Sequence, residues 1–391
     1  MWPNYWYSPY KILSAYLKGK DKIIEWPYFK NRTLIYTHFS RVSIFLACKH
    51  LNLSSGDEVL APSYNCGSEI DPLLFCGAKV VLYRVKENTN IDIEDILSRI
   101  SSSTKAIYVI HYFGWPQELT ELVKICKERG ILLIEDCALS LFSKDDHGPI
   151  GCAGDAAIHC FWKTLPVPDG GALSLPDETL KAVEKLKAPR LSSVVQTTSP
   201  FIKSWLRGRG RKYLGHFYKD LRNVYRRLRG TETSMSKKEK ESQFPQLIPE
   251  CYFDERIKDR GISRLSKGLM ISAEPERIIN LRRKNYKQLY EAIYDLPGVQ
   301  PLYSDLPVGV CPLVMPVLVK DRNKWLNSLD MFNVFPYKWW MYYHPAFSWD
   351  EFPEAIKLKN HLLAFHINQY MDEDDIKHVA NSIKKVSYNV K

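Results

Sequence analysis

The chain has 391 residues, of which 55 are basic and 44 acidic, and its formal net charge is +11. With 45% hydrophobic and 25% charged residues it has the composition of a globular protein, which excludes intrinsic disorder and fibrous repeats. The nine cysteines lack zinc-type spacing, which favours reduced thiols and predicts no metal site. No apolar run approaches the roughly 20 residues of a membrane span, and residues 1–10 do not follow the signal-peptide pattern. We therefore expect a cytoplasmic protein.

Four helical patterns alternate with four apolar runs between residues 41 and 175. The helical patterns cover 42–51, 68–76, 93–100 and 116–129, and the strand-like runs cover 58–61, 79–83, 106–111 and 131–134. Near-continuous apolar strands separated by helices predict an α/β fold with a mostly parallel sheet that is covered on both faces.

The remainder of the chain predicts a smaller α+β part. Helical patterns at 255–270 and 274–294 precede a strand near 311–319 and a closing helix at 373–386. We therefore expect three parts: a large α/β domain with an N-terminal arm at 1–190, a basic helical insertion at 191–250, and an α+β C-terminal domain at 251–391.

The positive charge is concentrated in the predicted insertion. Residues 203–240 carry 13 Lys or Arg and three acidic residues. Within them, residues 212–229 combine an apolar and a basic face at helical spacing, which predicts an amphipathic helix. Its partner is open: an anionic membrane surface, which would make the protein peripheral to the inner membrane face, the phosphates of a substrate, or the protein body itself. No nucleic-acid motif accompanies the charge, so nucleic acid is not an expected partner.

Two residues beyond strand-like runs are candidates for catalysis. Asp136 follows a buried run, and Lys163 comes 27 residues later, shortly before a Gly-Gly pair. In such sheets ligands bind beyond the carboxyl ends of the strands. A Lys and an Asp suit pyridoxal phosphate, because the amine can bond covalently to its aldehyde and the carboxylate can keep its ring nitrogen protonated. Taken singly, each residue has a structural alternative, the Asp as a helix cap and the Lys as a surface side chain.

Other catalytic classes receive less support. The chain has no GxGxxG motif after a strand and no GxxxxGK[ST] loop, so it does not resemble a dinucleotide-binding oxidoreductase or a P-loop protein. His159 and Cys160 are adjacent, but neighbours on a strand point to opposite faces, which disfavours a Cys–His catalytic pair.

Several segments between residues 40 and 175 resemble DegT/StrS-type sugar aminotransferases in sequence, order and spacing. They are Gly56–Tyr64, Gly77–Val81, Thr104–Ile107, His111–Gly114, Ile134–Asp136, Gly154–Ala157 and the block from Lys163 to Gly171. A weaker similarity continues through residues 282–290 and 365–386. The resemblance implies the type I pyridoxal-phosphate transferase fold and a homodimer with active sites at its interface.

The same resemblance assigns candidate cofactor residues. Lys163 matches the lysine that binds pyridoxal 5'-phosphate, and Asp136 matches the partner of its ring nitrogen. Ser40 and Arg41 fall where the family binds the cofactor phosphate at the start of a helix, a place that favours anions. Their alternative roles are a helix cap and a surface residue.

Four positions depart from the family pattern. Leu139 stands where Gln or His is usual and cannot form a hydrogen bond with the cofactor. Cys66 stands where an aromatic ring commonly stacks on the cofactor, so either Tyr64 or another aromatic residue stacks there, or none does. Cys160 stands where the family has a serine that contacts the cofactor phosphate. Ser263 stands where the family has an asparagine that one subunit contributes to the active site of the other. These departures favour, as an alternative, a catalytically inactive binding or regulatory protein, which the retained lysine–aspartate pair opposes.

The leading hypothesis is a pyridoxal-phosphate-dependent aminotransferase that moves an amino group from glutamate to a nucleotide-linked keto-sugar, in the synthesis of polysaccharide or glycan precursors. Both substrates are implied by the resemblance alone. His111, Tyr112 and His344 are candidates to line the substrate pocket, although His344 suits a structural role in its aromatic run equally well. Lys163 argues against the family's dehydratase branch, which has His there. An aminotransferase for a non-sugar ketone remains a further alternative.

Overall fold

The computed structural model describes residues 9–19, 24, 26–29, 31–177, 185–208 and 245–390. Among them, no helix is both long and apolar enough to span a bilayer. The amphipathic helix predicted at 212–229 lies outside the described residues, and its partner stays a prediction.

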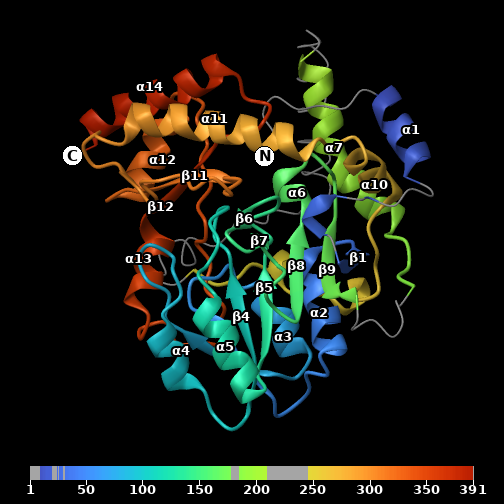
Figure 1. Ribbon diagram of the computed structural model, residues 1–391. Helices are drawn as coiled ribbons and strands as arrows, with labels where there is room; N and C mark the ends of the chain where they lie inside the picture. The colour runs from blue at the N-terminus through green and yellow to red at the C-terminus, as the bar shows by residue number, and fades with distance from the viewer. Residues whose placement is uncertain are drawn as a thin grey trace, which may run out of the picture.

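A seven-stranded sheet forms the centre of the large part of the molecule, with the strand order β1-β9-β8-β5-β4-β2-β3 (Figure 1). Strands β8, β5, β4, β2 and β3 are mutually parallel, whereas β9 is antiparallel to both β8 and β1. The strands are β1 (Arg32–Thr37), β2 (Glu58–Pro62), β3 (Lys79–Tyr83), β4 (Thr104–Ile110), β5 (Leu132–Asp136), β8 (Ala156–Cys160) and β9 (Gly171–Pro176). The predicted mostly parallel α/β fold is thus confirmed.

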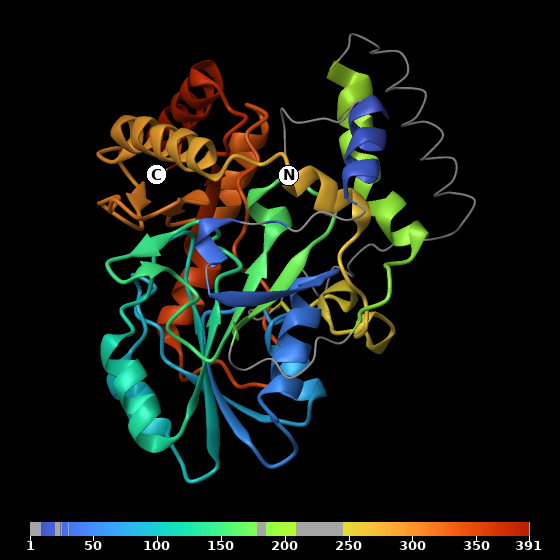
Figure 2. The same ribbon diagram turned by 45° about the vertical axis from the view of Figure 1, so that its right-hand side comes forward.

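The central strands are buried on both faces of the sheet. Every residue of β2 and β8 is buried, as is all of β4 except Lys105. Such continuous burial requires a layer of helices on each face, and Figures 1 and 2 show α2 and α5 on opposite sides of the sheet. The helices of this part are α2 (Ser40–His50), α3 (Ile70–Phe75), α4 (Ile93–Arg99), α5 (Thr120–Arg129) and α6 (Phe161–Thr164).

Helix α5 begins four residues later than its pattern predicted, for a local reason. The side chain of Gln117 accepts a hydrogen bond from the Ile91 backbone and donates one to the Thr89 carbonyl, at 2.9 and 3.0 Å. The Gln117 backbone N–H donates to His111 at 2.9 Å. These three bonds hold the residues around Gln117 in a loop that is bonded to the loop at Thr89–Ile91, so the helix begins only after them.

The C-terminal part lies on the side toward which β4, β5 and β8 point (Figure 1). A three-stranded antiparallel sheet of order β10-β11-β12 is packed with helices there, which agrees with the predicted α+β architecture. Its elements are α10 (Arg264–Met270), α11 (Pro275–Ile293), β10 (Gln300–Pro301), β11 (Val314–Leu318), α12 (Arg322–Asp330), α13 (Pro353–His361), β12 (Leu362–His366) and α14 (Glu373–Asn389). The domain boundaries proposed at residues 190 and 250 stay predictions.

The helix predicted over 255–270 is interrupted in the structure. A 3-10 turn, η4 (Glu255–Ile257), is followed by extended chain, and α10 starts only after Ser263. The Ser263 hydroxyl caps α10 by accepting a hydrogen bond from the Ser266 backbone at 3.1 Å. A serine cap satisfies an otherwise free N–H of the first turn, which is why the helix begins there.

The N-terminal helix α1 (Pro9–Lys18) packs closely against α10 (Figure 2). Two glycines make this approach possible: a Cβ on Gly268 would lie 1.7 Å from the Ala15 carbonyl oxygen, and one on Gly19 would lie 2.0 Å from that of Arg264. The remaining described elements are η1 (Pro27–Phe29), β6 (Lys144–Asp145), β7 (Gly148–Pro149), α7 (Leu191–Gly208) and η3 (Pro249–Cys251).

Candidate active site

Lys163 and Asp136 line one cavity at the carboxyl ends of β5 and β8. Asp136 is the last residue of β5, and Lys163 lies on the short helix α6 that directly follows β8. The cavity is lined by Ser40, Arg41, Ile44, Cys66, Ser68, Glu69, Ile110, Asp136, Ala138, Leu139, Lys163 and Trp340. The structure therefore brings together four of the residues that the sequence suggested for cofactor binding.

Asp136 is a buried carboxylate with a fixed orientation. It accepts hydrogen bonds from the Tyr108 hydroxyl at 2.6 Å and from the Ala138 backbone N–H at 2.8 Å. Burial raises the pKa of Asp136, and the charge of Lys163 and the bond from Tyr108 offset this only in part. Glu135, its neighbour on β5, points to the other face of the sheet, as alternation along a strand requires.

The amine of Lys163 is available for chemistry. It makes no hydrogen bond or ion pair with any residue that the structure describes. Burial lowers the pKa of this amine, but nearby acidic groups, Asp136 among them, raise it by more, so the net pKa lies above the ordinary value. The amine is therefore charged at neutral pH, beside the Asp136 carboxylate.

The start of α2 forms another wall of the cavity. Its cap residue, Phe39, makes no side-chain capping bond, and the start of a helix favours an anion through its N–H groups and its dipole. Ser40 donates its hydroxyl to the His159 carbonyl at 3.1 Å, and Arg41 donates to the Tyr252 carbonyl at 2.7 Å. Gly171 lets β9 approach this helix start, because a Cβ there would lie 2.7 Å from the Ser40 nitrogen.

Glu69 and Trp340 line the cavity but were not found from the sequence. Glu69 accepts hydrogen bonds from the Cys66 backbone at 2.8 Å and from its thiol at 2.6 Å. Burial, with the Glu69 charge as the next cause, raises the pKa of the Cys66 thiol, which therefore stays protonated and donates. Glu69 was not a candidate because the helical pattern over residues 68–76 does not show which of its side chains face the cavity.

Leu139, Tyr64 and Cys160 occupy three different surroundings. Leu139 lines the cavity with hydrocarbon. Tyr64 does not line it: its hydroxyl donates to the Trp339 carbonyl at 2.5 Å, and its ring packs at a tilt on Trp340, with centroids 5.0 Å apart. Cys160 is buried at the end of β8, outside the lining. The aromatic ring that reaches the cavity is thus Trp340.

His111 belongs to a buried structural cluster. Its Nδ1 accepts a hydrogen bond from the Gln117 backbone, so Nε2 carries the proton and donates to Glu135 at 3.0 Å. Possible ligand atoms of His111, Glu135 and Cys137 lie within 4.8 Å of one another. Because Glu135 also accepts from the backbones of Gly151 and Gly154, hydrogen bonds within the protein account for this cluster.

Tyr112 and His344 also lie away from the cavity. The Tyr112 hydroxyl donates to the Tyr64 carbonyl at 2.5 Å, and the ring is fully buried. His344 lies 3.5 Å from Asp71 and accepts a hydrogen bond from the Ala346 backbone at 3.2 Å. None of the three residues suggested for substrate binding lines the cavity at Lys163.

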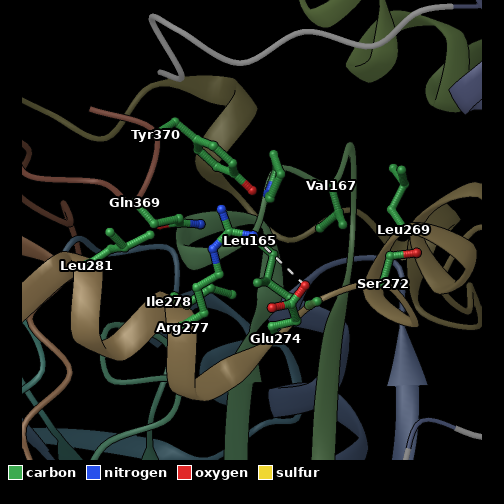
Figure 3. A pocket seen from close by; sticks show the side chains of 12 residues that line it. Leu165, Val167, Leu269, Ser272, Glu274, Arg277, Ile278, Leu281, Gln369 and Tyr370 are labelled. Carbon is green, nitrogen blue, oxygen red and sulfur yellow. Dashed lines mark ion pairs between the residues drawn. The ribbon is translucent and has the colours of Figure 1, made fainter. Parts of the chain in front are cut away.

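A separate surface groove of about 220 Å³ lies between α10, α11 and the segment after α6 (Figure 3). Leu165 and Val167 line it, but Lys163 does not. An ion pair of 4.0 Å between Glu274 and Arg277 lies along its edge, and both side chains are largely exposed, so this pair adds little stability. No residue that the sequence suggested for the site lines this groove.

The sequence of this chain is similar to the sequences of one protein family. Residues 28–209 match the model of the DegT/DnrJ/EryC1/StrS aminotransferase family. GDP-perosamine synthase from Vibrio cholerae is 30% identical over 133 residues, which cover 33% of this chain and 36% of that protein. The dTDP-4-dehydro-2,3,6-trideoxy-D-glucose 4-aminotransferase from Saccharopolyspora spinosa is 31% identical over 150 residues, 38% of this chain and 39% of that protein. The matched segments thus span less than half of either relative.

Longer matches extend over nearly the whole chain at lower identity. Protein MJ1066 from Methanocaldococcus jannaschii is 23% identical over 376 residues, which cover 92% of this chain and 87% of that protein. The solved structure of a DegT DnrJ EryC1 StrS aminotransferase from Brucella abortus has a TM-score of 0.63 and 16% identity, and covers 99% of this chain and 92% of that one. The structure of sugar aminotransferase CalS13 from Micromonospora echinospora has a TM-score of 0.62 and 15% identity, and the match covers 98% of this chain and 93% of that one. The predicted fold is thereby confirmed.

Proposed function

We propose that the chain, whose residues 28–209 match the model of the DegT/DnrJ/EryC1/StrS aminotransferase family, is a member of that family and a pyridoxal-phosphate-dependent aminotransferase that aminates a nucleotide-linked keto-sugar. The observation that supports this most directly is the cavity itself. It combines a lysine amine that has no hydrogen-bond partner among the described residues, a buried carboxylate and a helix start that lacks a side-chain cap.

The residues of the cavity fit pyridoxal 5'-phosphate. Lys163 would hold its aldehyde carbon, Asp136 its ring nitrogen, and the start of α2 with Ser40 and Arg41 its phosphate. When bound, this cofactor withdraws electrons from the substrate carbon that carries the amino group.

The protein's own groups supply orientation and proton transfer. Tyr108 and the Ala138 N–H fix the carboxylate of Asp136, which stabilises positive charge on a ring nitrogen. Lys163 is charged before the reaction, because its pKa is raised, and it must give up a proton to become a nucleophile. Once displaced from its covalent role, the same amine can carry a proton between substrate atoms as a general acid and base.

The substrates follow from the relatives. Two of these are named for a GDP-linked and a dTDP-linked sugar, and a third, SpsC of Bacillus subtilis, for the synthesis of spore coat polysaccharide. We therefore propose a nucleotide-linked keto-sugar as acceptor, glutamate as donor and a homodimer as the working form. A membrane contact through residues 212–229 also remains a proposal.

Amine transfer can be assayed directly. The purified protein is loaded with pyridoxal phosphate and given glutamate with a GDP-linked or dTDP-linked 4-keto-6-deoxyhexose, or with a set of 2-keto acids. We expect 2-oxoglutarate to be released and an aminated sugar nucleotide to be detected by mass spectrometry. Transfer to keto acids alone would favour the non-sugar alternative. Loading without any transfer would favour the non-catalytic one.

A further inference from the structure

Two side chains that can act as nucleophiles line the cavity at Lys163. One is the amine of Lys163 itself, and the other is the thiol of Cys66, in a cavity of only about 50 Å³. A cysteine is a good nucleophile only as the thiolate, and a lysine only as the neutral amine. Which of the two groups reacts with an aldehyde in this cavity therefore depends on where the protons lie.

Glu69 binds both polar groups of Cys66. Its carboxylate accepts hydrogen bonds from the Cys66 backbone N–H at 2.8 Å and from the Cys66 thiol at 2.6 Å. Only 6% of Glu69 is exposed, and it forms no ion pair with any residue that the structure describes. Although Glu69 directly precedes α3, its side chain makes no bond that caps this helix. Within the described part of the chain, the hydrogen bonds of this carboxylate thus serve Cys66.

Ser68 completes the polar surroundings of the thiol. Its hydroxyl oxygen lies 2.9 Å from the sulfur of Cys66. A thiol carries one proton, and Glu69 accepts it, so the Ser68 hydroxyl is the donor in this contact. The two bonds fix the orientation of the thiol, with its proton directed at Glu69.

The charges around Cys66 act in opposite directions on its proton. Burial is the largest cause that raises the pKa of the thiol, and the negative charge of Glu69 is the next. The positive charge of Lys163 and the bond from Ser68 lower this pKa, but by less. The other titratable groups that interact with the thiol are Tyr64, Arg41, Tyr108 and Lys359. Because cations stabilise a thiolate, loss of the Glu69 charge would favour an ion pair between Cys66 and Lys163.

We propose that Glu69 is a positioning residue that keeps Cys66 a protonated hydrogen-bond donor, so that Lys163 is the single nucleophile of the cavity. A thiolate would compete for the aldehyde of the cofactor: its sulfur would bond to the carbonyl carbon, and the carbonyl oxygen would take up a proton. Cys66 stands where the family commonly has an aromatic ring, and Glu69 compensates for the thiol that this departure places in the cavity. The inference rests on the proposed function for the identity of the aldehyde.

The first test measures how the alkylation of Cys66 depends on pH. The full-length, cofactor-free protein is treated with iodoacetamide, and peptide mapping gives the rate at Cys66, with exposed Cys152 as the internal reference. Glu69→Gln keeps the shape of the side chain and removes its charge. We expect it to lower the midpoint of the pH profile by at least about one pH unit and to raise the rate at pH 8 about tenfold. Exposed Glu94→Gln is the control and should change neither quantity.

The second test measures the consequence for Lys163. Cofactor-free protein is treated with iodoacetamide at pH 8, freed of the reagent, loaded with pyridoxal phosphate and reduced with borohydride, and the pyridoxyl group on Lys163 is quantified. We expect wild type to keep most of its label and Glu69→Gln to lose most of it, because an alkylated Cys66 fills the cavity. Cys66→Ala combined with Glu69→Gln has no thiol at this position and should keep its label through the treatment.

The inference is overturned if Glu69→Gln leaves the alkylation rate unchanged or raises it by the same factor at every pH, as a loosened structure would. It is also overturned if the double variant loses its label as Glu69→Gln does. Failure of the proposed function would look different. In that case untreated wild type would carry no label on Lys163 or transfer no amine, while the pH profile of Cys66 would still depend on Glu69.

Discussion

The side chains at Lys163 show which functional residues a sequence can reveal. Asp136 was predictable because it ends a buried strand, and Lys163 because its spacing and neighbours match a family pattern. Glu69 and Trp340 were not, because nothing in their local patterns indicates which wall they reach. His111 was a candidate to line the substrate pocket, but its side chain donates to Glu135 and does not line the cavity at Lys163.

The charge of Asp136 should matter more than its hydrogen-bonding capacity. Asp136→Asn keeps an acceptor for the Ala138 N–H but removes the negative charge that stabilises a protonated ring nitrogen. We expect kcat of the amine transfer to fall at least about 100-fold. Steady-state kinetics measure this, with exposed Asp146→Asn as the control. Near-normal kcat in Asp136→Asn would show that this carboxylate does not stabilise the reaction.

At the scale of elements, Lys359 of α13 forms hydrogen bonds with two segments that each contribute a wall residue to the Lys163 cavity. It is fully buried and donates to the Asn65 carbonyl, next to Cys66, and to the Tyr342 carbonyl at 2.7 Å, two residues after Trp340. Its charge lies over the rings of two aromatic residues, Tyr343 and Trp349. This role could not be predicted from the helical pattern, because a lysine on a helix is normally solvated.

Lys359 should make the stability of the protein depend on pH. Burial lowers the pKa of Lys359 to about 7 in the folded protein, against an ordinary value of 10.5. Between these values the unfolded chain binds a proton that the folded chain does not, so raising the pH favours folding. We expect the free energy of unfolding of wild type, relative to Lys359→Met, to rise by about 2 kcal/mol from pH 7 to pH 9.

Urea unfolding of both proteins at several pH values measures this difference. A constant difference from pH 7 to pH 9 would mean that Lys359 titrates outside that window.

The contact between α1 and α10 depends on the missing side chains of Gly19 and Gly268, and Gly268 can be tested by itself. Gly268→Ala would place a Cβ 1.7 Å from the Ala15 carbonyl oxygen, so α1 must move away. We expect a loss of about 1–3 kcal/mol in the free energy of unfolding and faster proteolysis of the N-terminal arm. In a chain that begins at residue 20, the same substitution should be neutral or slightly stabilising, because alanine favours a helix. Equal destabilisation in both chains would show that α1 is not responsible.

At the scale of the whole molecule, the alternation of apolar strands and helices was enough to predict the layered α/β part. Strands β1 and β9 were not predicted, and neither was the antiparallel direction of β9 between β1 and β8. One hydrophobic core includes side chains of both the large sheet and the C-terminal helices. Most of the segment that carries the net charge, residues 209–240, lies outside the described residues, so its role stays a prediction.

The most direct test of the account is to locate the cofactor on the chain. The protein is loaded with pyridoxal phosphate, reduced with borohydride, digested and mapped by mass spectrometry, with Lys163→Ala and exposed Lys105→Ala treated in parallel. We predict one reduced pyridoxyl group, on Lys163, that is absent from Lys163→Ala and retained in Lys105→Ala. A label on another lysine, or no label after loading, would contradict the assignment of this cavity as the active site.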